Sequence, residues 1–168
     1  ILKVFITAKY KVHRTKGNRE MILENEKIKQ ALEYIKEEDP ATTQDTLNMC
    51  QIPAPSYKEE KKAEYIRERF REIGLRDVRI DAVGNVLGIW PGTGEGPSVM
   101  LAAHTDTVVP EGTDLTIRKE GNRYYCPGIN DDTHAVAEMI AVAKAMIHAD
   151  LHTKGDLIFC ANVCEEGL

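Results

Sequence analysis

Three short polar segments contain the side chains that could do chemistry. They are His104-Thr105-Asp106, Asp131-Asp132 and Glu165-Glu166, which together hold one imidazole and five carboxylates. Carboxylates that face one site repel one another unless divalent cations or bases neutralise them. Because no arginine lies within the three segments, a metal is the economical explanation. Mixed imidazole and carboxylate ligands suit zinc or manganese better than calcium.

Each segment also has a structural explanation when it is taken singly. A histidine after a strand is more often a hydrogen-bonded structural residue than a metal ligand. Paired aspartates before a helix are ordinary partners of its N-terminus, and paired glutamates can form a solvated loop. The metal hypothesis therefore depends on the three segments coming together.

The neighbouring elements predict that they do. Residues 98–103 and 156–163 are apolar runs typical of buried strands, and residues 133–148 carry apolar side chains at helical spacing on almost every side. Each polar segment follows one of these strands or precedes this helix. Because ligands gather at the carboxyl ends of strands in open α/β sheets, we expect the three segments to share one edge.

The upstream half shows further regular patterns. Apolar spacing predicts helices over 24–38 and 43–50 and hairpins over 78–90 and 115–125. Another helix is predicted to start with a capping box of Ser56 and Glu59 and to end at Gly74. Strands that alternate with helices predict an α/β fold with a mostly parallel sheet.

Composition excludes several function classes. The 168 residues are 42% hydrophobic and 29% charged, which is typical of one globular domain. The net charge is −5, although residues 1–20 are basic, so the acidic body argues against a nucleic-acid partner. No apolar run suits a membrane span or a signal peptide, so we expect no membrane partner and a cytoplasmic location. The four cysteines are expected to be free thiols.

The ends of the chain suggest a division into two parts. Residues 1–20 are expected to be a basic tail or an upstream extension, with Met21 as the candidate start. Residues 21–168 are then the folded part. Because the chain stops at Leu168, directly after a strongly patterned segment, we expect a domain truncated at its C-terminus.

Three motifs in order resemble a known family. They are Met100-Leu101-Ala102-Ala103-His104-Thr105-Asp106-Thr107-Val108, Gly128-Ile129-Asn130-Asp131-Asp132-Thr133 and Cys164-Glu165-Glu166-Gly167. They resemble the motifs of the co-catalytic zinc exopeptidases and deacylases, a family that includes peptidase T, acetylornithine deacetylase and carboxypeptidase G. The resemblance covers about residues 28–168. It implies the N-terminal part of a three-layer α/β sandwich catalytic domain, without the lid domain and the C-terminal half.

The resemblance also implies a role for individual residues. His104 binds one zinc, Asp131 bridges two zinc ions and Glu166 binds the second, with manganese or cobalt as alternatives. Asp106 orients His104 and Glu165 is the general base. The peptide bond between Asp131 and Asp132 is expected to be cis.

The implied reaction is hydrolysis of peptide bonds in small peptides, of the aminopeptidase or tripeptidase type. One alternative is a deacylase of N-acyl amino acids with the same site, and another is a non-catalytic scaffold, against which intact Asp106 and Glu165 count. Further ligands are expected beyond Leu168, so these residues alone should be inactive. A homodimer is one option for the full-length protein.

Two residues depart from the family pattern. His134 stands two residues after the aspartate pair, where many members have a small residue, and we interpret it as a first-turn surface residue rather than a substrate contact. Cys164 precedes the glutamate pair, and we interpret it as a buried small hydrophobe.

Overall fold

The computed structural model describes residues 3–6 and 22–167. In chain order the elements are β1 (Lys3–Ile6), α2 (Glu26–Glu37), α3 (Asp39–Cys50), α4 (Glu60–Glu72), β2 (Arg76–Ile80), β3 (Val86–Trp90), β4 (Val99–His104), β5 (Arg118–Glu120), β6 (Arg123–Tyr125), the turn η1 (Ile129–Thr133), α5 (His134–His148) and β7 (Leu157–Asn162). None of the described helices is long and apolar enough to cross a membrane.

Five strands form one sheet in the order β1-β4-β7-β3-β2. Only β4 and β7 are parallel neighbours within the described residues; the other three pairs are antiparallel. The predicted α/β class is confirmed, but the sheet is mixed rather than mostly parallel. Strands joined by a short turn run antiparallel, and the β2–β3 hairpin enters the sheet beside β7.

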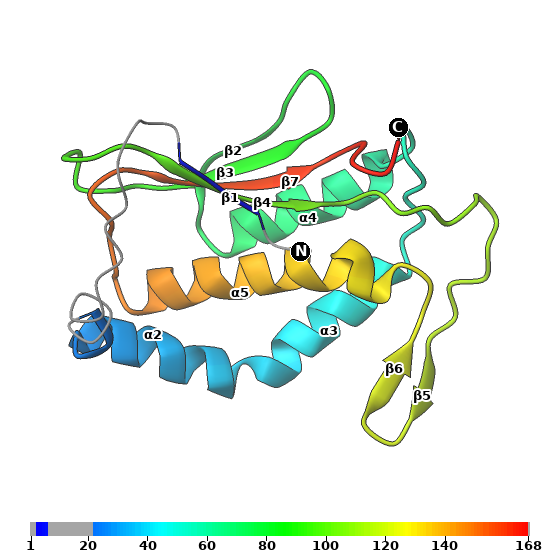
Figure 1. The fold of residues 1–168 in the computed structure, drawn as a ribbon, viewed down its shortest axis with the longest axis horizontal. Helices are drawn as coiled ribbons and strands as arrows, with labels where there is room; N and C mark the ends of the chain where they lie inside the picture. The colour runs from blue at the N-terminus through cyan, green and yellow to red at the C-terminus, as the bar shows by residue number, and fades with distance from the viewer. Residues whose placement is uncertain (1–2, 7–21, 168) are drawn as a thin grey trace.

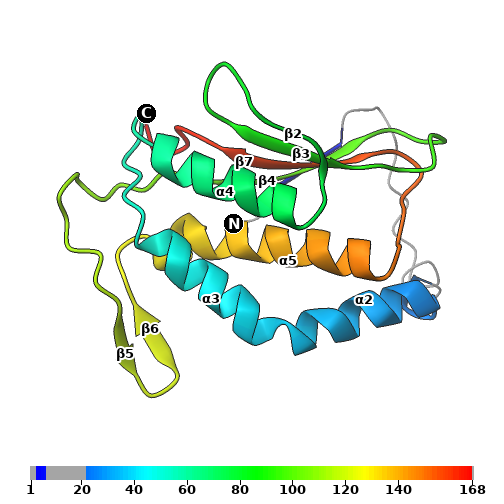
Figure 2. The ribbon, with the colours of Figure 1, turned by 180° about the vertical axis from the view of Figure 1, so that it is seen from behind.

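The described helices cover one face of this sheet (Figure 1). Helix α4 packs on β2 and β3, and α5 packs on β4 and β7. Helices α2 and α3 lie against α5 on the side away from the sheet (Figure 2). A three-layer sandwich has helices on both faces, so the described residues supply the sheet and one of its two helical sides.

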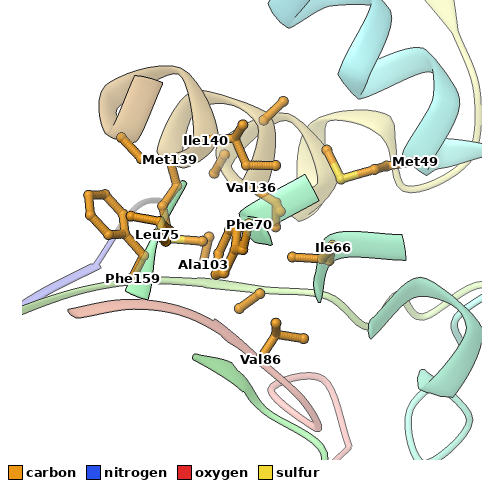
Figure 3. Packing of buried hydrophobic residues seen from close by; sticks show 14 of the residues in the cluster. Met49, Ile66, Phe70, Leu75, Val86, Ala103, Val136, Met139, Ile140 and Phe159 are labelled. Atoms are coloured by element: carbon orange, nitrogen blue, oxygen red, sulfur yellow. The ribbon is translucent and has the colours of Figure 1, made fainter. Parts of the chain in front are cut away.

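The core lies between the sheet and the inner helices (Figure 3). Ile66 and Phe70 of α4 meet Met139 and Ile140 of α5 and Phe159 of β7, and all five are fully buried. Removing side chains of this size from water contributes about 1.5–3 kcal/mol each. This packing fixes the strands whose ends form the site.

Most predicted elements are confirmed, with two differences near the N-terminus. Helix α3 starts at Asp39 rather than at residue 43, because Pro40 lies in its first turn, where a missing N–H is tolerated. Lys3–Ile6, within the expected tail, forms β1 and pairs with β4. Residues 7–21, with the candidate start Met21, lie outside the described residues. The β5–β6 hairpin is confirmed and projects from the body (Figure 1).

Two loops touch at the sheet edge opposite the carboxyl ends of β4 and β7. A Cβ atom on Gly155 would lie 1.9 Å from the carbonyl oxygen of Pro97, and one on Gly92 would lie 2.2 Å from that of Gly155. Contacts this short exclude any side chain at these positions. Glycine is therefore what lets the loop before β7 lie against the loop before β4.

Candidate metal centre

The parallel pair of β4 and β7 brings the predicted segments together. The strands run in register from Val99 opposite Leu157 to His104 opposite Asn162, so their carboxyl ends meet. His104 is the last residue of β4, and the glutamate pair follows β7 after two residues. The side chain of Asp132 accepts the backbone N–H of His104 at 3.2 Å, which fastens η1 to the same edge.

His104 is almost completely buried, with 6% of its surface exposed. Its Nδ1 lies 3.1 Å from the backbone oxygen of Asp106 and 3.4 Å from that residue's Oδ1. Its Nε2 lies 3.2 Å from Oδ1 of Asp131, whose side chain is largely exposed. Nδ1 of His104 therefore faces Asp106, and Nε2 faces Asp131, the other predicted ligand.

Two groups of potential ligand atoms share this histidine. One consists of His104, Asp131 and Asp132, and the other consists of His104, Glu165 and Glu166. Within each group the ligand atoms all lie within 4.8 Å of one another. The structure thus brings the three predicted ligands, His104, Asp131 and Glu166, to one edge, with Asp132 and Glu165 beside them. The peptide bond between Asp131 and Asp132 is cis, as expected.

Asp106 is fully buried and forms hydrogen bonds with several parts of the site. Its Oδ1 accepts the backbone N–H of Glu165 at 3.1 Å, and its Oδ2 accepts that of Glu166 at 2.9 Å. Burial acts to raise the pKa of Asp106, but a hydroxyl and the backbone N–H groups outweigh it and hold that pKa below its ordinary value. Asp106 is therefore a buried carboxylate that fixes the glutamate turn.

The capping box predicted at residues 56–59 is wrong. Helix α4 begins at Glu60 without a side-chain cap. The Ser56 hydroxyl instead donates to Oδ2 of Asp106 at 2.7 Å, and Oε1 of Glu59 accepts the backbone N–H of Cys164 at 3.1 Å. Both side chains therefore support the site through hydrogen bonds. Their partners are distant in the sequence, so a local sequence pattern does not reveal these contacts.

The two residues that depart from the family pattern behave differently. Nδ1 of His134 lies 3.4 Å from Oγ1 of Thr46, and its Nε2 lies 3.2 Å from Glu138 one turn along α5. These contacts agree with a first-turn surface residue. Cys164 is only half-buried, with φ at 56°, and its thiol donates to Glu59 at 3.5 Å. The interpretation as a buried small hydrophobe therefore fits poorly, because the thiol is used in a polar contact.

Sequence reasoning gave no role to Lys62. This residue of α4 is 2% exposed, and its Nζ donates to Oγ1 of Thr133, directly after the aspartate pair, at 3.4 Å. Burial lowers the pKa of Lys62 to about 8, against the attraction of two nearby thiols and Asp106. Its place in an amphipathic helix, beside the exposed Lys61, gave no signal of burial.

The donor set fits a divalent metal. One imidazole nitrogen and carboxylate oxygens are ligands that zinc and manganese accept. Groups of three protein ligands leave a coordination position for water or substrate, which is typical of catalytic rather than structural sites. The buried carboxylate beside the imidazole resembles the usual outer partner of a metal-binding histidine.

Comparison with known proteins gives consistent relatives. The chain is 35% identical over 119 residues to a putative [LysW]-lysine/[LysW]-ornithine hydrolase of Pyrococcus abyssi, which covers 71% of this chain and 32% of that protein. It is 31% identical over 121 residues to a succinyl-diaminopimelate desuccinylase of Corynebacterium glutamicum, covering 72% and 32%. The chain thus spans about a third of the length of the curated relatives it matches.

The fold also matches solved structures. A tripeptidase from Staphylococcus aureus superposes with a TM-score of 0.63 at 23% identity, covering 75% of this chain and 36% of that one. The fold is that of zinc-peptidase catalytic domains, and the predicted resemblance to zinc exopeptidases and deacylases is confirmed. The pattern of Peptidase family M28 matches residues 85–168, which include all three polar segments. The chain belongs to Peptidase family M28.

Proposed function

We propose that this chain is the N-terminal part of the catalytic domain of a metal-dependent exopeptidase that trims small peptides, of the aminopeptidase or tripeptidase type. The observation that carries the proposal is the sharing of His104 between two carboxylate groups at one sheet edge. Membership of a peptidase family supports it.

In this proposal His104, Asp131 and Glu166 hold two zinc ions, with manganese or cobalt as alternatives. When bound, the metal supplies Lewis-acid polarisation of the scissile carbonyl and acidifies water. Support comes from the two groups of potential ligand atoms, because within each group these atoms lie within 4.8 Å of one another. Asp131 is the exposed member, as a residue that meets substrate-side solvent should be.

In the proposal, the remaining side chains have roles other than metal binding. Glu165 is the general base: it takes a proton from the attacking water and passes it to the leaving amine. Asp106 is a positioning residue, because its two oxygens fix the backbone of both glutamates and one of them faces Nδ1 of His104. Ser56 keeps the Asp106 carboxylate in place through its hydroxyl.

The second candidate is a deacylase of N-acyl amino acids that uses the same site. It is favoured by the names of two relatives, a lysine or ornithine hydrolase and a desuccinylase. Both reactions break an amide bond with water, so the residues named above serve either. A cytoplasmic location, a homodimer and the division at residue 21 stay predictions.

The roles of the two glutamates are tested in the full-length protein. Glu165→Gln should keep its metal content but lower turnover about 100- to 10,000-fold, the range for a general base. Glu166→Gln should lose metal and turnover together. Glu95→Gln, at an exposed loop position, is the matched control and should change neither. Equal metal loss in the first two variants would contradict the assignment.

The substrate class is tested with the same protein. Tripeptides and N-succinyl or N-acetyl amino acids are compared by kcat/KM at equal metal loading. Faster hydrolysis of tripeptides supports the peptidase, and faster hydrolysis of the acyl amino acids supports the deacylase. No hydrolysis of either class by a metal-loaded protein would overturn both.

A further inference from the structure

The amine of Lys62 is a buried charge that the proposed function does not use. Lys62 belongs to α4 and is 2% exposed. Its Nζ donates to Oγ1 of Thr133 at 3.4 Å, and no ion pair among residues 22–167 includes it. Burying an ammonium group with so few partners destabilises the folded state. Because local structure that is unfavourable for stability is often found at functional sites, this amine is a candidate for a role in the site.

Thr133 connects this amine to the turn that contains Asp131. Thr133 is 2% exposed and is the last residue of η1, directly after Asp131 and Asp132. The side chain of Asp132 is 1% exposed and accepts the backbone N–H of His104 at 3.2 Å. Nε2 of His104 lies 3.2 Å from Oδ1 of Asp131. A contact at Thr133 therefore acts on the turn that presents Asp131 to His104.

The Asp131 carboxylate depends on its backbone for its position. Its side chain is 74% exposed, so little packing holds it. The turn is fastened on one side of Asp131 by Asp132, which binds the end of β4, and by Thr133, which meets α4 through Lys62. Helix α4 is a rigid support, because its Ile66 is fully buried in the core. Lys62 thus joins a fixed helix to the exposed carboxylate two residues before Thr133.

We propose that Lys62 is a positioning residue of the metal centre: its ammonium group holds Thr133 and thereby keeps Asp131 where it can bind a metal beside His104. This inference rests on the proposed function, in which Asp131 is a metal ligand. Lys62 itself touches neither metal nor substrate. Outer partners of metal ligands typically change metal affinity 10- to 100-fold when they are removed. Because Lys62 acts through Thr133, we expect an effect at the lower end of this range.

The sign of the effect separates positioning from two other roles. A charge that acts only through its field repels a metal cation, so its removal would tighten binding. A residue that matters only for folding would weaken binding because the protein becomes less stable. Burial lowers the pKa of Lys62 to about 8, so Lys62→Met is expected to stabilise the folded protein at pH 7. Weaker metal binding by a more stable protein therefore indicates positioning.

The experiment measures Zn²⁺ binding to the full-length protein by isothermal titration calorimetry at pH 7. Urea unfolding of the same samples with a chelator measures stability without metal. Lys62→Met should weaken Zn²⁺ binding about 10-fold while unfolding at a urea concentration no lower than the parent. Lys61→Met, at an exposed position of the same helix, is the matched control and should change neither quantity.

The contact itself is tested from its other side. Thr133→Val removes the hydroxyl that accepts from Lys62 and should also weaken Zn²⁺ binding, whereas Thr133→Ser keeps a hydroxyl and should retain parent affinity. The double variant Lys62→Met with Thr133→Val should bind no more weakly than the weaker single variant, because both changes break one contact. A double variant whose loss equals the product of the single losses would overturn the proposal.

Unchanged or tighter Zn²⁺ binding by Lys62→Met would also overturn it. Asp131→Asn in the same titration distinguishes this failure from failure of the proposed function. Zn²⁺ binding that Asp131→Asn weakens and Lys62→Met does not would contradict the role of Lys62 alone. Zn²⁺ binding that Asp131→Asn leaves unchanged would contradict the ligand assignment, and the role of Lys62 with it.

Discussion

Replacing Lys62 with methionine removes a buried ammonium group while keeping a side chain of similar length. The pKa of Lys62 is lowered by burial to about 8 from an ordinary 10.5. One pKa unit corresponds to about 1.4 kcal/mol, so the charged amine costs the folded state about 3 kcal/mol at neutral pH. The substitution should therefore stabilise the protein at pH 7 by up to about this amount, less the weak hydrogen bond to Thr133.

The pH dependence gives the sharper test. Below pH 8 the amine is charged in both states, and the full cost is present. Between about 8 and 10.5 the folded protein has released the proton and the unfolded chain has not, so stability rises with pH. The gain from Lys62→Met should accordingly be largest near pH 7 and should shrink towards pH 10.5.

The assay is urea unfolding followed by the fluorescence of Trp90, the single tryptophan. Reductant and a metal chelator keep the thiols and the metal centre in one state. Subtracting the free energy of unfolding of the variant from that of the parent at each pH cancels the contribution of the other titrating groups. Lys61→Met, at an exposed position of the same helix, should show no such trend. A difference that stays constant from pH 7 to 10.5 would refute the reasoning.

Two further substitutions test the anchoring of the site and the packing of the loops. Ser56→Ala removes a hydrogen bond that lowers the pKa of Asp106, so that pKa should rise and about 1.5–3 kcal/mol of stability should be lost at neutral pH. This loss should shrink on acidification, because the lowered pKa stabilises the fold only while the carboxylate is ionised; urea titrations from pH 7 to 3 measure this, and a loss that grows as the pH falls would contradict it. Gly155→Ala should destabilise the protein by several kcal/mol, because the added Cβ would lie 1.9 Å from a carbonyl oxygen. Gly94→Ala, in open space with φ at 88°, should cost only about 1–2 kcal/mol, and thermal unfolding of both variants measures the difference.

Local patterns predicted the elements well. The 3.6-residue period places Ile66 and Phe70 on the buried side of α4, and the alternation around the Gly84-Asn85 turn gives the β2–β3 hairpin. The segments with His104 and the glutamates were predicted at strand ends because apolar runs precede them. The structure confirms their meeting at one edge, while the role of each residue stays a prediction.

Non-local contacts account for what the sequence did not reveal. Ser56 satisfies a local capping pattern, yet its hydroxyl is engaged by Asp106, 50 residues away. Lys62 occupies a polar position of α4, yet it is buried in the fold, near Cys50 and Cys126 from other parts of the chain. The direction of β3 against β7 likewise depends on where the hairpin docks, which periodicity does not encode.

The pairing of β4 with β7 has a consequence for when the site comes into being. The two strands must find each other across the β5–β6 hairpin and α5, and contacts so distant along the chain form slowly. Until they do, the histidine and the glutamates are separate, and an unfolded chain offers no assembled cluster. An ion that binds only the finished edge shifts the folding equilibrium by mass action, in proportion to the logarithm of its concentration. Metal supply would then govern how much of the chain is folded, as well as what the folded chain can do.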